Sequence, residues 1–379
     1  MTKLLEQINI EKTAHQISDL MEIKYGFGLP ERNRVMGAIP VYASSGLVGF
    51  HNESKVKKPS IIIGRKGNVG SLSYSEKESY PIDTVFYVDE VSEDFDLKYV
   101  YYLLQRINLP RYGGDSAVPG LNRDTIYSIS VETPCKETQK RIASILSAYD
   151  KKIENNNIII KNLETTAQTI FNEWLIDFKF PGYENVKMVE SDLGEIPEGW
   201  EVKRLDKIAD FLNGVASQKY PAERQEDSFP VIKIREMNSG IDKSSDRATK
   251  NIDTKYIIKK GDILFAWSGS LSVMVWIGED GILNQHIFKV TSQYYPKWFV
   301  YQYLQRHLQE FKAIAEGKAT TMGHIQRHHI SDALVLIPNE SLLRKADKIL
   351  SNLFEKQISL YVENISLRSQ RDQLLAKLI

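Results

Sequence analysis

Residues 139–178 read QKRIASILSAYDKKIENNNIIIKNLETTAQTIFNEWLIDF and contain neither proline nor glycine. Mostly apolar side chains recur along this stretch at alternating spacings of four and three residues, the repeat that lines one face of a coiled-coil helix. That face consists of Ile142, Leu146, Tyr149, Ile153, Asn156, Ile160, Leu163, Ala167, Ile170 and Trp174. Phe180-Pro181-Gly182 follows, where proline cannot continue a helix and glycine permits a turn. The stretch therefore predicts one long helix over residues 139–178.

The same pattern occurs a second time, 204 residues further along the chain. The second set consists of Ala346, Leu350, Leu353, Gln357, Leu360, Asn364, Leu367, Arg371, Leu374 and Leu378. We call the two sets together the seam. A compact domain between the helices would bring the second helix back along the first, so we expect an antiparallel coiled-coil hairpin. Polar residues in the second set lower the stability of such a hairpin but fix its register.

The segments that precede the two helices also repeat. Phe229–Ile232 corresponds to Ile39–Tyr42, and residues 299–306 (FVYQYLQR) correspond to residues 99–106 (YVYYLLQR). Each copy contains short β-rich runs, among them Ser60–Ile63 and an expected strand over Pro81–Val88. A last short strand is expected over Ile126–Val131. We predict an α+β fold with an internal repeat and approximate twofold symmetry.

The repeat predicts four parts. These are a first globular domain over residues 1–137, a central spacer helix over 138–181, a second globular domain over 182–338 and a C-terminal spacer helix over 339–379. The composition limits the compartment: one cysteine, Cys135, excludes an intrachain disulfide and fits a reducing environment. No apolar run approaches the roughly 20 residues that cross a bilayer. We expect a cytoplasmic protein without a membrane partner.

The sequence contains no constellation of residues that predicts catalysis. Neither a phosphate-binding GxxxxGK[ST] loop nor a dinucleotide-binding glycine motif is present, and we expect no cofactor. His324, His328 and His329 raise the possibility of a metal site. Cysteine and carboxylate ligands are missing at useful spacing, so contact of these histidines with a base or a phosphate is the preferred interpretation.

Several loops carry side chains of the types that read DNA. Arginine can donate two hydrogen bonds to guanine, asparagine and glutamine can pair with adenine, and lysine and arginine hold phosphates. The candidates in the first domain are Arg65 and Lys66 of the Gly64-Arg65-Lys66-Gly67 loop, with Asn68, Arg111, Asn122 and Arg123. Those in the second are Ser268, Gln285, His286, Lys318, Thr320, Thr321, Gln326, Arg327 and His328. Taken singly, each is also typical of a solvated surface; Arg123 and Arg327, 204 residues apart, are the strongest pair.

The two helices carry more apolar residues than a solvated hairpin needs. Those outside the seam are Ile145, Ile158, Ile159, Phe171, Ile349, Phe354, Ile358, Tyr361, Ile365 and Leu375. We expect further helices from a partner protein to cover them.

Two stretches are the most specific in the chain: Gly194-Glu195-Ile196-Pro197-Glu198-Gly199-Trp200, and Gln139–Ser147 followed by Asp150–Glu154. With them the chain resembles the specificity subunits of type I restriction-modification systems. The first stretch is similar to the opening of a target recognition domain, and the second is similar to the start of the central spacer helix. The resemblance implies a non-catalytic subunit whose two recognition domains each read half of a bipartite, asymmetric site in double-stranded DNA. It also implies that the helices set the unread gap and bind two adenine-methylating modification subunits, with restriction (nuclease-translocase) subunits outside.

Two other interpretations stay open at this point. A DNA-modifying enzyme with its own recognition domains is disfavoured by the missing catalytic motifs. A coiled-coil adaptor that binds proteins is compatible with the equal numbers of acidic and basic residues, 49 of each.

Overall fold

The computed structural model describes residues 11–113, 120–317 and 323–379. The chain divides into two compact units, Met1–Ile153 together with Leu367–Ile379 (unit 1) and Glu154–Ser366 (unit 2). The two long helices contribute to both units, and each unit is described by itself.

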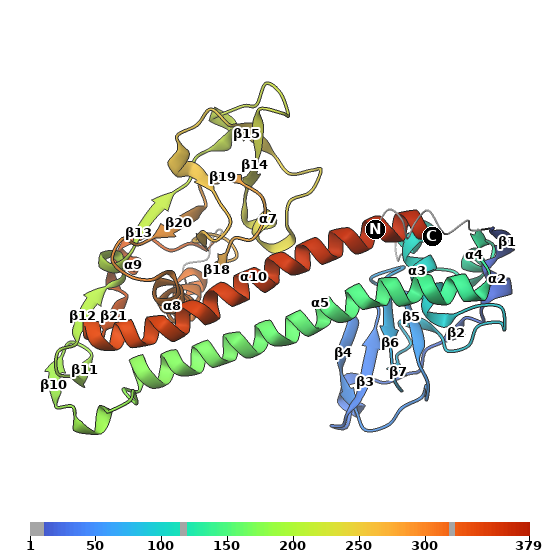
Figure 1. Ribbon diagram of the computed structural model, residues 1–379, viewed down its shortest axis with the longest axis horizontal. Helices are drawn as coiled ribbons and strands as arrows, with labels where there is room; N and C mark the ends of the chain where they lie inside the picture. Colours follow the sequence, from blue (N-terminus) through green and yellow to red (C-terminus); the bar gives the residue numbers. More distant parts are fainter. Residues whose placement is uncertain (1–10, 114–119, 318–322) are drawn as a thin grey trace. The chain divides into compact units, whose positions relative to one another are not determined.

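Unit 1 is built on a four-stranded antiparallel sheet (Figure 1). Its strands, in spatial order, are β2 (Lys24–Tyr25), β8 (Val85–Val88), β5 (Ser60–Gly64) and β6 (Leu72–Ser75). Every residue of β5 is buried, as the run of three isoleucines predicts for a central strand. Helix α3 (Leu97–Ile107) packs against β5 and β6 and buries Tyr99, Tyr102 and Leu104 completely.

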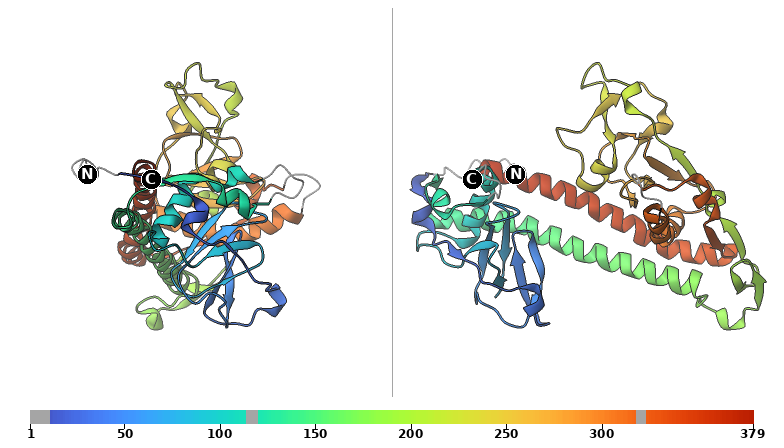
Figure 2. Two further views of the ribbon diagram at one scale, coloured as in Figure 1. Left: turned by 90° about the vertical axis from the view of Figure 1, so that its right-hand side faces the viewer. Right: turned by 180° about the vertical axis from the view of Figure 1, so that it is seen from behind.

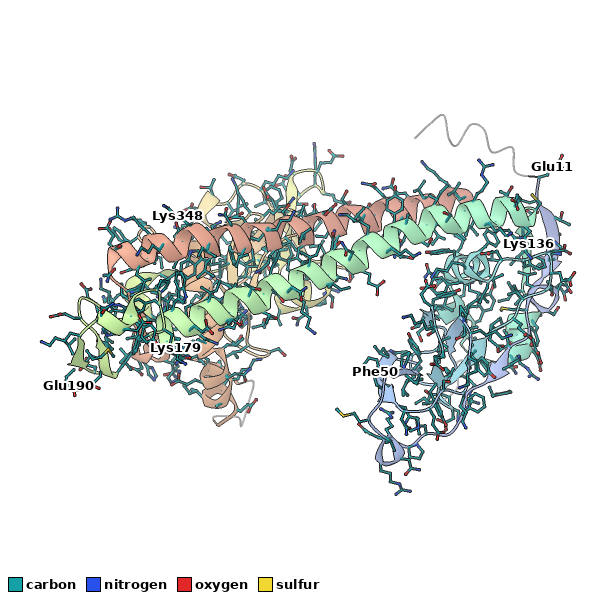
Figure 3. The ribbon with its side chains drawn as sticks, turned by 60° about the horizontal axis from the view of Figure 1, so that its bottom comes forward. Glu11, Phe50, Lys136, Lys179, Glu190 and Lys348 are labelled. Carbon is teal, nitrogen blue, oxygen red and sulfur yellow. The ribbon has the colours of Figure 1, made fainter. Side chains whose placement is uncertain are left out.

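A second sheet of unit 1 joins β4 (Gly46–His51), β3 (Ile39–Ala43) and β7 (Tyr80–Pro81), with β3 and β7 parallel. Phe50 lies near the end of β4 and is exposed (Figure 3). A two-stranded pair, β1 (Thr13–Gln16) and β9 (Ser130–Thr133), completes the strands. The short helices are α2 (Ile17–Leu20), α4 (Arg123–Tyr127) and the 3₁₀ turns η1 (Glu31–Asn33) and η2 (Leu109–Tyr112).

Unit 2 repeats this architecture, which confirms the internal repeat. The central sheet has the order β13 (Asp210–Asn213), β20 (Ile287–Thr291), β17 (Ile263–Ala266) and β18 (Ser272–Val275). Its registers correspond to those of unit 1: Phe265 faces Phe288 as Ile63 faces Phe86. The second sheet is β15 (Arg247–Thr249), β14 (Ser228–Ile232), β19 (Gly281–Leu283) and β16 (Ile257–Ile258), again with one parallel pair, β14 and β19.

The remaining elements of unit 2 follow the same order. Strands β12 (Glu201–Arg204) and β21 (Leu334–Ile337) pair as β1 and β9 do, and the helices are α6 (Leu205–Ile208), α7 (Ile234–Ser239), α8 (Lys297–Gly317) and α9 (Arg327–Asp332). Unit 2 adds a hairpin, β10 (Met188–Ser191) with β11 (Gly194–Pro197), on which Glu190 is marked in Figure 3. The 3₁₀ turns are η4 (Tyr183–Asn185), η5 (Ser217–Lys219) and η6 (Thr254–Tyr256).

Two expected strands are corrected. The Pro81–Val88 run divides between two sheets, because a turn in which the Val85 amide donates to the Ile82 carbonyl separates β7 from β8. The Ile126–Val131 run begins as the last residues of α4, and only its end belongs to β9. Asn122 begins α4 by accepting a hydrogen bond from the Asp124 amide, a helix start that the apolar residues alone do not indicate.

The two predicted long helices are confirmed as α5 (Lys136–Phe171) and α10 (Glu340–Leu378) (Figures 1 and 2). Helix α5 continues into a short π-helical turn, η3 (Asn172–Ile176), before Gly182 turns the chain with a φ of 92°. Within unit 2, Asn156 contacts Asn364 and Glu164 contacts Tyr361, so the helices run antiparallel. The predicted coiled-coil hairpin is therefore present.

The seam residues lie in the hydrophobic cores or in the contact between the helices. In unit 1, Ile142, Leu146, Leu374 and Leu378 are buried with the residues of α3, and Ile153 is buried as well. In unit 2, the buried seam positions are Asn156, Ile160, Ala167, Ala346, Leu350, Gln357, Leu360 and Asn364. The others, Tyr149, Leu163, Ile170, Trp174, Leu353, Leu367 and Arg371, are half-buried.

The structure corrects the expectation that a partner covers all the apolar residues outside the seam. Phe171 and Phe354 are 0% and 5% exposed because the core of unit 2 covers them. Ile145 and Leu375 pack against the core of unit 1 in the same way. Ile158, Ile349 and Ile365 remain exposed, at 55%, 40% and 42%. None of the helices in the described part of the chain is long and apolar enough to span a membrane.

Candidate nucleic-acid interface

The first candidate loop of unit 1 follows the buried strand β5. Glycine is required at position 64, because a Cβ there would meet the Asn68 carbonyl oxygen at 2.1 Å. The carbonyl of Arg65 accepts a hydrogen bond from the Leu121 amide at 2.9 Å, and Lys66 forms an isolated β-bridge with Gly120. The tertiary structure thus places the Gly64–Asn68 loop beside the start of α4, more than 50 residues away in the sequence.

Arg65 and Arg123 meet at one aromatic ring. Their guanidinium carbons lie over the ring of Tyr25, 5.3 and 5.5 Å from its centroid, and Tyr25 is 52% exposed. Arg65 also lies over Phe86 and donates to the Asp83 carbonyl at 2.8 Å, whereas Arg123 lies over Tyr127. Neither arginine forms an ion pair with any carboxylate that the structure describes, and the Nε atom of each is buried without a hydrogen-bond partner there.

The other candidates of unit 1 surround this cluster. Lys66, Asn68 and Arg111 are exposed. Arg111 donates to the Tyr112 hydroxyl at 2.7 Å and lies over the same ring. The preceding residue, Pro110, lies so near Gly70 of the loop after β5 that a Cβ on Gly70 would meet its nitrogen at 2.4 Å. The Asn122 side-chain oxygen caps α4, so this residue positions the helix that carries Arg123. The structure thus brings the six candidates of unit 1 to one region.

Unit 2 places the corresponding segments together in the same way. The Ile325 amide donates to the Trp267 carbonyl at 3.1 Å, and Ser268 forms a β-bridge with His324. Trp267 therefore stands where Arg65 stands in unit 1. Its ring stacks on Phe288 at 5.8 Å and lies 5.9 Å from His286, and its Nε1 donates to Asn213 at 3.0 Å.

Ser268, Gln285 and His286 form one polar chain. The Ser268 hydroxyl contacts Nδ1 of His286 at 3.0 Å, and the Gln285 amide nitrogen contacts Nε2 at 3.2 Å. Ser268 is buried, whereas Gln285 and His286 are half-buried. Ser268 thus fixes the orientation of the imidazole, and Gln285 and His286 hold the more accessible polar atoms.

The start of α9 carries the last group of candidates. Gln326 precedes the helix, and its backbone amide donates to Nδ1 of His329 at 3.0 Å. Arg327 lies over Phe288 at 5.7 Å, and His328 is exposed with its ring 4.0 Å from that of His329. Lys318, Thr320 and Thr321 lie outside the described residues.

A pocket of about 300 Å³ opens at this place in unit 2. It is lined by Asn213, Trp267, Phe288, His324, Ile325, Gln326 and Arg327. In the part of the chain that the structure covers, no three histidine, cysteine or acidic side chains gather in a way that would hold a metal ion. The pocket therefore presents an aromatic surface edged by amide and guanidinium donors, a combination suited to the edges and faces of bases.

Sequence reasoning missed the aromatic residues of both clusters. Tyr25 lies 40 residues before Arg65, on a two-residue strand that no periodicity reveals. Trp267 directly follows a buried strand, and its alignment with Arg65 through the internal repeat was the signal that could have identified it.

Comparisons with known proteins identify the family to which the chain belongs. A family described as type I restriction modification DNA specificity domain matches residues 9–165 and 197–364, once for each repeat. The chain is 28% identical over 303 residues to the type I restriction enzyme MjaIX specificity subunit of Methanocaldococcus jannaschii, covering 74% of this chain and 68% of that protein. It is 24% identical to the HindI specificity subunit of Haemophilus influenzae, covering 86% of each.

A solved structure has the same fold. The S subunit of a type I restriction-modification system from M. genitalium superimposes with a TM-score of 0.65 and 18% identity, covering 98% of this chain and 96% of that chain. The family match spans most of the sequence and both of its repeats. The chain belongs to the family of type I restriction-modification DNA specificity proteins.

Proposed function

We propose that this chain is the DNA-recognition subunit of a type I restriction-modification complex, with each repeated unit reading one half of a bipartite, asymmetric site. The observation that carries the proposal is the recurrence of one arrangement in both units. In each, the loop after the buried central strand meets the start of a short helix, at Arg65 and Arg123 in unit 1 and at Trp267 and Arg327 in unit 2. Side chains of the types that can contact bases and phosphates surround both places.

We assign the catalytic steps to other subunits. Two modification subunits would methylate adenine, and restriction subunits would translocate and cleave the DNA, while this chain supplies the sequence specificity. Because the proposed partner is genomic DNA, we place the complex in the cytoplasm. Methylome sequencing of cells with and without this gene tests the proposal: a bipartite methylated motif should disappear with the gene, and a motif that persists without it would contradict the assignment.

The exposed apolar residues of the long helices support docking of the modification subunits. Ile158, Ile349 and Ile365 lie on α5 and α10 and are at least 40% exposed. Replacing Ile158 and Ile365 by aspartate should reduce co-purification of the modification subunit, because an apolar contact would acquire two desolvated charges. Tyr294→Asp is the matched control, since this residue is 83% exposed and lies outside both helices.

The hairpin would set the length of the unread gap. Inserting one heptad into both α5 and α10 lengthens each helix by about 10 Å, which corresponds to roughly 3 base pairs of DNA. The methylated motif should acquire a gap longer by that amount while its two halves stay the same. An insertion of seven residues at the exposed Leu193 turn of the β10–β11 hairpin should leave the gap unchanged. If the doubled heptads also leave the gap unchanged, the helices do not measure it.

A further inference from the structure

The pair of arginines on Tyr25 in unit 1 allows a more specific statement, which rests on the proposed function. A guanidinium group that lies over an aromatic ring uses its face for that contact, and its N–H donors lie in its plane. Because Nε is buried in both residues, the two terminal nitrogens form the fork that stays available for two acceptors side by side. Arg65 uses one N–H of Nη2 for the Asp83 carbonyl and keeps the other, and the side chain of Arg123 has no hydrogen bond among the described residues.

The charge of this cluster is uncompensated in the part of unit 1 that the structure describes. Two cations within 5.5 Å of one ring centroid repel each other, and no described carboxylate forms an ion pair with either. Two cations held on one ring raise the free energy of the unbound protein, and electronegative acceptors bound to their free N–H groups would lower it. The major-groove edge of guanine offers the N7 and O6 acceptors at the spacing of an arginine fork.

The equivalent place in unit 2 has a different chemistry. Trp267 takes the position of Arg65. Asn213 takes the position of Tyr25, because it pairs with Phe288 in the sheet as Tyr25 pairs with Phe86. Arg327 corresponds to Arg123, since each is the first residue of its short helix, and it lies over Phe288. The second cluster therefore offers one arginine fork and an indole face where the first offers two forks.

We propose that Arg65 and Arg123 each read a guanine in the half-site bound by unit 1, with Tyr25 as the positioning residue that holds both guanidinium groups. The first half-site then requires two guanines for these two side chains. The second half-site, read through Trp267 and Arg327, requires one guanine at the corresponding places.

The test is methylome sequencing of cells that carry the complete system with a variant of this chain. Arg65→Gln and Arg123→Gln should each relax the requirement for one guanine in the same half-site and leave the other half-site intact. Binding of the assembled complex to its own site should fall roughly 10- to 100-fold for each variant, the usual effect of losing one bidentate contact. Arg106→Gln is the matched control, because Arg106 is an exposed arginine of the same unit at the end of α3.

Arg65→Lys separates base reading from phosphate binding, because lysine keeps the charge and loses the fork. It should relax the motif as the glutamine variant does. If it preserves both motif and affinity, or if the glutamine variants weaken binding equally on all sequences, Arg65 contacts phosphate and the proposal is wrong.

Tyr25→Phe should retain the motif and Tyr25→Ala should relax it at both guanine positions. Relaxation at an A·T pair, or in both half-sites, would also overturn the proposal. A wild-type motif that does not depend on this gene would instead contradict the proposed function itself.

Discussion

The buried polar layer of the coiled coil provides a quantitative test of how the hairpin is held in register. Asn156 is 0% and Asn364 is 2% exposed. The Asn156 amide nitrogen donates to Oδ1 of Asn364 and to Oε2 of Glu363, both at 2.9 Å, and Asn364 donates in turn to Asn157 at 2.9 Å. Each seam asparagine thus depends on its partner across the interface.

Asn156→Leu removes the donor while Asn364 stays buried. The Oδ1 atom of Asn364 then loses this hydrogen bond without gaining water, which costs about 1–3 kcal/mol. The reciprocal Asn364→Leu should cost less, because the Asn156 amide nitrogen keeps its hydrogen bond to Oε2 of Glu363. In the double variant both polar groups are gone and two leucines meet in the seam, so the double variant should be about as stable as the original chain or more stable. With the double variant near zero, the coupling free energy equals the sum of the two single costs, which is at least about 1–3 kcal/mol, and is favourable.

The measurement is urea unfolding of the full chain followed by the helical circular dichroism signal, for the original, both single variants and the double variant. Asn155→Leu is the matched control, because this neighbouring residue is exposed and its replacement should change the unfolding free energy by less than about 0.5 kcal/mol. Additive effects of the two single changes, or a single Asn156→Leu that stabilises the chain, would refute the idea that the two amides depend on each other.

Three other outcomes are expected. Gly64→Ala should destabilise unit 1 and abolish reading of its half-site, because the new Cβ would meet the Asn68 carbonyl at 2.1 Å; thermal unfolding and the methylated motif report this. The hydrogen bond from Arg204 lowers the pKa of Asp206, which also accepts from Ser331. A lowered folded pKa stabilises the protein above the ordinary carboxyl value of 3.8, and this contribution is lost as the pH falls through the folded pKa. The melting temperature of Asp206→Asn should therefore lie below that of the original chain near neutral pH and converge with it in acid. DNA binding by the assembled complex should weaken steeply with salt, as counterion release requires, and a flat dependence measured by titration at several salt concentrations would contradict phosphate contact.

Under the proposed function, the differences between the units account for one fold reading two DNA sequences. In each unit, a loop and the start of a short helix lie together at the end of a central strand of the four-stranded sheet. Corresponding backbone hydrogen bonds hold them there in both units. Arg65 and Trp267 lie in the loops directly after β5 and β17. A different side chain at either position therefore leaves the buried strands undisturbed. Recognition can therefore change while the scaffold remains.

Elements whose signals are local or periodic could be predicted from the sequence. The four-three spacing from Ile142 to Trp174 predicts a long helix, because residues at that spacing lie on one face of a helix. Pro181 and Gly182 end it, because proline cannot continue a helix and glycine permits a turn. The repeat at 204 residues predicted a second helix and a second domain, since copies of one sequence pattern fold alike. The polar seam residues also followed from spacing alone.

What covers the helices and which side chains meet depend on contacts between residues that are distant in sequence. Phe171 and Phe354 looked like a docking surface, yet the core of unit 2 covers them, because burial depends on residues distant in sequence. Tyr25, Arg65 and Arg123 likewise come from three separate segments that sheet pairing and the bridge between Lys66 and Gly120 bring to one ring. Residue types and spacing along a chain carry no information about such convergence, since it arises from pairing between strands rather than from any local repeat.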